Sequence, residues 1–102
     1  MPLKISKTRT FTRTCTAADG STFEATFKAL SDDEVDGHDF TSLAGEKAFL
    51  RDVVKGLGDI IDDEDKPLPF EAALDFVLGA ADLRKPLLVE YRLGVIGART
   101  GN

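Results

Sequence analysis

Residues 3–30 decide the fold, and they read LKISKTRTFTRTCTAADGSTFEATFKAL. Threonine occupies every even position from 8 to 16, and such β-branched alternation indicates a strand. Residues 21–30 alternate again, with aromatic and small apolar residues at odd positions. The intervening AADG at 17–20 is typical of a turn, so this stretch predicts a β-hairpin.

The length of the turn decides which side chains share a face of the hairpin. A two-residue loop would place threonines opposite the phenylalanines of the second strand. A three-residue loop that ends at Gly20 instead pairs Phe11 with Phe27 and Cys15 with Phe23. Because this register puts all the aromatic side chains on one face, we predict it, with Gly20 in the left-handed conformation of a bulged turn.

After the hairpin, the sequence predicts an acidic loop at 31–42 and then a helix over about 43–56. Ser42 is the expected N-cap of this helix, and glycines at 56 and 58 are expected to end it. Its apolar positions form one stripe, which comprises Leu43, Phe49, Leu50, Val53, Val54 and Leu57.

The rest of the chain predicts a turn-rich acidic linker at 59–69 and two further helices. One helix covers about 70–78 and ends at Gly79. The other begins between Asp82 and Pro86, and it groups Leu87, Leu88, Tyr91 and Val95 on one side. The sequence therefore predicts an α+β fold, with an N-terminal β-hairpin packed on about three short α-helices.

We expect residues 1–102 to form a single domain. It comprises the hairpin at 3–30, the acidic loop at 31–42, a helical part at 43–98 and a frayed tail at 99–102. A two-stranded hairpin is marginally stable by itself. Either the helices cover its aromatic face or another chain extends its sheet, which is a first indication of a homo-oligomer or a bound partner.

The composition is that of a soluble globular protein, with 102 residues, 42% of them hydrophobic and 30% charged. The single cysteine rules out an intrachain disulfide. We expect a cytoplasmic protein, because the first residues lack the apolar region of a secretory signal and no apolar run approaches the length of a membrane span.

The net charge of −5 is unevenly distributed. Residues 19–75 hold sixteen acidic side chains against five basic ones, whereas residues 1–14 carry four basic side chains and no acid. An acidic centre repels nucleic acid, so we expect no nucleic-acid partner. The centre is either a solvated surface or an acidic face that meets a basic partner or mimics DNA.

No motif predicts a catalytic or metal site. The segment 32–37 resembles the start of a calcium loop, but its twelfth position holds Leu43 in place of the bidentate glutamate. His38 is the only histidine, and Cys15 shares the parity of the apolar strand face. The acids of 62–65 read as a solvated loop. We therefore predict a non-enzymatic protein without metal or cofactor.

Four stretches carry a resemblance to a known family. They are KISKTRTFTRT at 4–14, TFEATFKALSDDEVD at 22–36, FLRDVVKGLGDIIDDEDKPLPFEAALDFVL at 49–78, and a closing helix with Tyr91 and the polar end GARTGN at 97–102. The chain resembles the tail assembly chaperones of long-tailed bacteriophages and prophages over nearly its full length. It departs from them at Asp65, where relatives often have glycine, and at Pro86, where a helix ordinarily continues.

The resemblance implies a chaperone that coats the tape measure protein in the host cytoplasm, aids assembly of the tail tube and is absent from the mature virion. Helix-in-groove contact with this helical client is the expected mode. The candidate partner-binding residues are Phe49, Leu50, Val53, Val54, Leu87, Leu88 and Tyr91. They are alternatively core residues. The alternative functions are a small acidic interaction protein such as a DNA mimic, and a minor tail or connector component.

Overall fold

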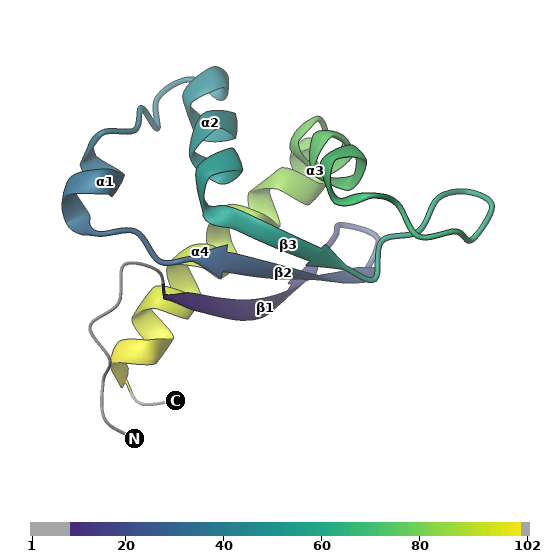
Figure 1. Ribbon diagram of the computed structural model, residues 1–102, viewed down its shortest axis with the longest axis horizontal. Coiled ribbons are helices and arrows are strands. Elements are labelled where there is room, and N and C mark those ends of the chain that lie inside the picture. Colours follow the sequence, from purple (N-terminus) through teal and green to yellow (C-terminus); the bar gives the residue numbers. More distant parts are fainter. Residues whose placement is uncertain (1–8, 101–102) are drawn as a thin grey trace.

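The computed structural model describes residues 9–100, and the side chains of residues 9–95. It has a three-stranded antiparallel sheet in the order β1-β2-β3, together with four helices, which confirms the α+β class. Figure 1 shows α4 crossing behind the sheet. In chain order the elements are β1 (Thr10–Thr16), β2 (Thr22–Lys28), α1 (Asp32–Asp36), α2 (Leu43–Val53), β3 (Val54–Gly58), α3 (Phe70–Leu78) and α4 (Ala81–Thr100).

The predicted hairpin register is confirmed. Phe11 pairs with Phe27 and Cys15 with Phe23 across the two strands, and Gly20 has a φ of 90°. The first strand was expected from residue 3, but β1 begins at Thr10, and residues 1–8 lie outside the described part of the chain. The odd positions of β1 and β2 face the helices, because hydrophobic burial selects the face that carries the aromatic side chains.

We expect the substitution Gly20→Val to lower the free energy of unfolding by about 1 kcal/mol or more, since a β-branched residue is strained at positive φ. Apart from Gly20 itself and its two chain neighbours, no heavy atom lies within 4 Å of the position of an added Cβ, so the cost comes from the local backbone conformation and not from a tertiary clash. Chemical denaturation measures it. Gly20→Asn is the matched control, because asparagine tolerates this conformation. Equal losses for valine and asparagine would contradict the explanation.

The predicted helix over 43–56 is wrong at its C-terminal end. It stops at Val53, and Val54–Gly58 forms β3, which pairs antiparallel with β2. Gly56 and Gly58 therefore lie within a strand and do not terminate a helix. The reason lies in the tertiary structure, because β2 has an open edge with which this segment can pair. β-branched residues and glycine also adopt the extended backbone of a strand readily. The chain itself supplies the third strand that the isolated hairpin lacked.

The predicted loop at 31–42 is wrong in its first half, where α1 forms. Ser31 Oγ accepts a hydrogen bond from the Glu34 N–H at 3.3 Å, and the Glu34 carboxylate accepts from the Ser31 N–H at 3.1 Å. These two bonds make a capping box. Its pattern, Ser-x-x-Glu, is present in the sequence and could have predicted the start of this helix. The second half is irregular until Ser42, which caps α2 as predicted by accepting from the Gly45 N–H at 3.0 Å.

The last two helices follow the prediction with small differences. α3 covers the predicted residues and ends at Gly79. α4 begins at Ala81, one residue earlier than expected, and contains Pro86. It extends to Thr100, so it includes two residues of the expected frayed tail; residues 101–102 lie outside the described part.

The hydrophobic core lies between the sheet and helices α2, α3 and α4. Tyr91 of α4 is its aromatic centre, with ring centroids 5.7 Å from both Phe11 and Phe27 and 5.2 Å from Phe49. The Leu30 N–H donates a hydrogen bond to the Tyr91 hydroxyl at 3.1 Å. Gly94 allows α4 to approach the sheet, because an added Cβ would lie 2.3 Å from the Phe11 ring.

Candidate functional site

The structure places six of the seven candidate partner-binding residues in the core. Phe49, Leu50, Val53, Val54, Leu87 and Tyr91 are all buried. Leu88 is partly buried and packs against the core. The burial of these side chains agrees with the alternative interpretation, in which they belong to the core and stabilise the domain. Leu43, the first residue of the predicted stripe, is 54% exposed. A partner-binding surface must therefore be built mainly from other residues.

A groove of about 510 Å³ opens between α1, α2, α4 and the loop that joins the first two of these helices. Phe49 and Tyr91 show one side to it although they are core residues. Its other apolar lining residues are Leu30, Val35, Phe40, Leu88 and Val95. The groove is thus the place where the core of the domain reaches the surface.

Phe40 contributes an exposed wall of this groove, and sequence reasoning did not single it out. Its ring centroid lies 4.9 Å from that of Phe49, yet the residue remains 49% exposed. The signal that the sequence contained was an isolated aromatic residue, Phe40, within an acidic segment. His38 packs edge-on against Phe49 at 5.3 Å, and its Nε2 lies 3.0 Å from an Asp52 carboxylate oxygen.

Asp39 holds the loop around Phe40 in place. Its carboxylate accepts hydrogen bonds from the Thr41 hydroxyl at 2.6 Å, the Thr41 N–H at 2.8 Å and the Ser42 hydroxyl at 3.0 Å. The bond from the Thr41 hydroxyl is the main reason that the pKa of Asp39 lies below its usual range. The groove wall is therefore a hydrogen-bonded turn next to the N-cap of α2.

Charged side chains of both signs border the groove. Asp32 of α1 and Glu46 of α2 supply negative charge, whereas Lys85 and Arg92 of α4 supply positive charge. An apolar floor between charged borders is typical of a surface that receives one face of an amphipathic helix. Fixed charges of both signs favour a client whose own charges are arranged to match.

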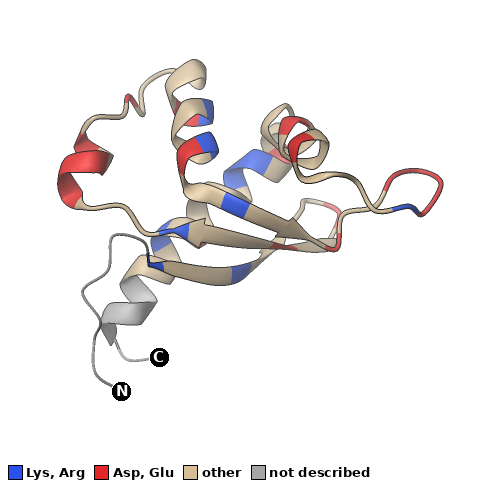
Figure 2. Ribbon diagram, viewed as in Figure 1, with Lys and Arg blue, Asp and Glu red and all other residues tan. Residues whose placement is uncertain are grey.

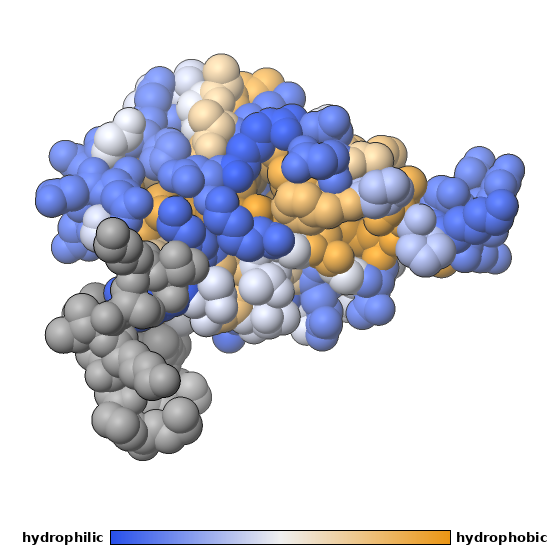
Figure 3. Space-filling view, viewed as in Figure 1, coloured by the Kyte–Doolittle hydropathy of each residue, from blue (hydrophilic) through white to orange (hydrophobic). Residues whose placement is uncertain are grey.

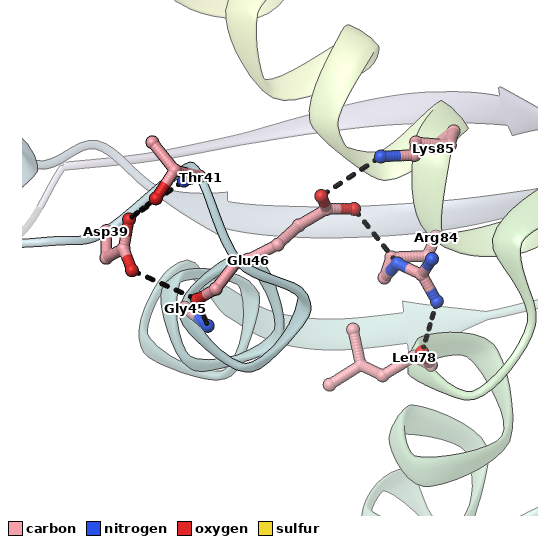
Figure 4. A network of polar contacts seen from close by, with 8 residues as sticks. Asp39, Thr41, Gly45, Glu46, Leu78, Arg84 and Lys85 are labelled. Carbon is pink, nitrogen blue, oxygen red and sulfur yellow. Dashed lines mark hydrogen bonds and ion pairs between the residues drawn. The ribbon is translucent and has the colours of Figure 1, made fainter.

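An ion-pair network joins three helices beside the groove (Figure 4). Glu46 accepts from Arg84 Nε at 2.9 Å and from Lys85 Nζ at 3.0 Å, and Arg84 Nη1 donates to the Leu78 carbonyl at 2.9 Å. Burial alone would raise the pKa of Glu46, but the hydrogen bonds and positive charges of Lys85 and Arg84 hold that pKa below its usual value. The network therefore fixes α2 and α3 to the start of α4.

A second hollow of about 290 Å³ lies between α3, the turn of the hairpin and the segment after β3. Ile61 and Phe76 line it and are 56% and 64% exposed. Figure 3 shows hydrophobic surface beside the base of the hydrophilic lobe that the loop after β3 forms. This hollow has less volume than the groove, and its aromatic lining residues are Phe23 and Phe76.

The residues considered for chemistry lie on separate elements, with Cys15 on β1, residues 32–36 in α1 and residues 62–65 in the loop after β3. Burial raises the pKa of Cys15 to about 12, so its thiol stays protonated. The calcium-like segment forms helix α1. In the acidic loop, Asp62 accepts from the backbone N–H groups of Glu64 and Lys66 at 2.8 and 2.9 Å. Within the described residues, no three His, Cys, Asp or Glu side chains are grouped to hold a metal ion.

Comparison of the chain with protein-family models, with curated proteins and with solved structures gives no match. Within residues 9–100, no helix is both long and apolar enough to cross a membrane.

Proposed function

We propose that this protein is a phage tail assembly chaperone that binds a helical segment of a tape measure protein in the groove between α1, α2 and α4. The observation that carries the binding mode is the groove itself, an apolar hollow with an aromatic floor and charged borders. The identity of the client, a tape measure protein, comes from the resemblance of the whole chain to this family. The role is non-enzymatic, and it is performed in the bacterial cytoplasm before the tail tube forms.

The dimensions of the groove suit side chains from one face of a helix. A volume of about 510 Å³ holds a few apolar side chains, not a complete helix. A client helix would lay residues spaced i, i+3, i+4 and i+7 along the floor, with its polar face in solvent. Arg92 favours acidic client residues on the α4 side, where Lys85 is already paired with Glu46, and Asp32 favours basic ones on the α1 side.

The distribution of charge argues against the DNA-mimic alternative. Figure 2 shows acidic residues concentrated in α1 and in the protruding loop after β3, at opposite ends of the molecule. A mimic of DNA needs rows of acids that match the phosphate spacing on rigid elements. Two clusters at opposite ends of the molecule, one on the short helix α1 and one in a loop, do not form such rows. No specific feature favours a minor tail or connector component.

The test is co-expression with the tape measure protein of the same phage. We expect Phe40→Asp to abolish the increase in soluble tape measure protein that the wild-type chain gives, since a carboxylate in the apolar groove is desolvated by the client. Phe76→Asp is the matched control, because Phe76 is equally large, is 64% exposed and lies outside the groove. Both variants should unfold at nearly the same denaturant concentration as the wild type.

Two outcomes would refute the proposal. One is a tape measure protein that is equally soluble without this chain. The other is a mature virion that contains this chain in amounts comparable with the tube protein, which would favour the tail-component alternative. If Phe76→Asp abolishes the increase in soluble tape measure protein and Phe40→Asp does not, the client binds at the second hollow, and the groove assignment is wrong.

A further inference from the structure

Strand β1 has an open edge. β2 pairs with β1 on one side, and among the described residues no strand pairs with it on the other. The strand has seven residues, contains no proline and shows no register shift against β2. A regular edge strand of this kind is a template for a further strand, unless it is protected.

The register defines which backbone groups the open edge presents. The Ala29 N–H donates to the Arg9 carbonyl at 2.7 Å, and the Ala17 N–H donates to the Ser21 carbonyl at 2.8 Å. Residues 9 and 17 therefore bond to the β2 side, and the alternation of an antiparallel ladder assigns the same direction to the odd positions between them. The N–H and C=O groups of the even positions, Thr10, Thr12, Thr14 and Thr16, point to the open edge.

The edge carries little electrostatic protection against pairing. Arg13 is the only charged residue within β1, and its Nε donates to Glu90 of α4 at 2.9 Å, so its charge is already balanced. The two largest acidic clusters, in α1 and in the loop after β3, lie away from this edge (Figure 2). Two copies can therefore approach through β1 without a close clash of like charges.

Helix α4 offers an apolar side chain, Leu93, on the same flank of the molecule. Glu90 and Gly94 face β1, as their contacts with Arg13 and Phe11 show. Leu93 lies three residues after Glu90, so it is close to this side of the helix, and it is 46% exposed. The groove lies on the other side of α4, where Leu88 and Val95 line it. Backbone pairing and an apolar helix contact are thus available side by side.

We propose that a second copy of this chain pairs with β1, so that two three-stranded sheets join into one antiparallel six-stranded sheet with Leu93 of both copies packed beneath it. A two-fold axis at Thr12 places Thr12 opposite its counterpart and Thr10 opposite Thr14 of the partner. It also places Arg13 opposite Phe11 rather than opposite another arginine, which avoids a pair of like charges. Such an isologous contact is self-complementary.

Cysteine cross-linking of the full chain tests the pairing and its register. The native Cys15 is buried and its pKa is about 12, so Cys15 does not take part in cross-linking and only the introduced cysteine reacts. We expect Thr12→Cys to form a disulfide-linked dimer under mild oxidation, and Thr10→Cys to cross-link only when mixed with Thr14→Cys. Thr22→Cys is the matched control, since it shares the outer face on β2 and would lie about 30 Å from its counterpart, three strand spacings across the sheet and eight residues along it.

Sedimentation equilibrium provides a second measurement. We expect Leu93→Glu to raise the dimer dissociation constant at least tenfold, and Thr12→Pro to do the same, because proline removes an N–H that points away from β2. Leu93→Glu keeps the test decisive if the proline variant does not fold. A wild-type chain that stays monomeric at high micromolar concentration, or a Thr22→Cys variant that cross-links as readily as Thr12→Cys, would overturn the proposal. Neither result bears on client binding in the groove.

Discussion

Replacing Tyr91 by alanine is expected to lower the free energy of unfolding by about 3–5 kcal/mol, as for other buried aromatic residues. The side chain contacts the rings of Phe11, Phe27 and Phe49, which come from three different elements. Its removal leaves a cavity between the sheet and α2 that these rings cannot fill without losing their own contacts. Urea denaturation monitored by circular dichroism measures the change.

Tyr91→Phe separates packing from hydrogen bonding. It keeps the ring and removes only the hydroxyl that accepts from the buried Leu30 N–H, so the expected loss is about 1–3 kcal/mol. Similar losses for alanine and phenylalanine would mean that the hydrogen bond, and not the ring, makes the main contribution. A loss below about 1 kcal/mol for Tyr91→Ala would contradict its position at the centre of the core.

The hairpin could be predicted because two independent constraints agree. The alternation of β1 and β2 assigns each side chain to a face, and only the three-residue loop places Phe11 and Phe27 on the same face. Strand β3 could not be predicted in this way. The helical period of α2 continues through Val53, Val54 and Leu57, so the sequence predicts a longer helix. The segment instead pairs with the open edge of β2, and this edge exists only in the folded sheet.

The candidate site was harder to predict than the fold. Apolar residues at helical spacing indicate that a face is buried, but not whether the protein or a partner buries it. Phe49 and Tyr91 show the difficulty, since both are core residues and both line the groove. Phe40 belongs to no periodic pattern, and its position depends on the turn that Asp39 forms with Thr41.

Removing the Glu46 carboxylate is the second change for which we expect a large effect. Glu46→Ala leaves the guanidinium of Arg84, whose side chain is 10% exposed, without its anionic partner. A buried charge that loses its partner typically costs several kcal/mol, so we expect unfolding to become easier by about 3 kcal/mol. Asp75→Ala is the matched control. It breaks an ion pair with Arg51 of good geometry, at 2.6 Å, but both side chains are largely exposed, and the expected loss is below about 1 kcal/mol.

The effect of Glu46→Ala should depend on pH in a direction that the folded structure defines. Lys85 and Arg84 hold the pKa of Glu46 below its value in the unfolded chain despite the opposing effect of burial. A carboxylate with a lowered folded-state pKa stabilises the protein fully above its unfolded pKa of about 4.3, and it loses this contribution as the pH falls through the folded value. The difference in stability between the wild type and Glu46→Ala should therefore be constant from about pH 6 to 8 and should shrink below about pH 4. A difference that grows on acidification would show that Glu46 stabilises the fold by a route other than its charge.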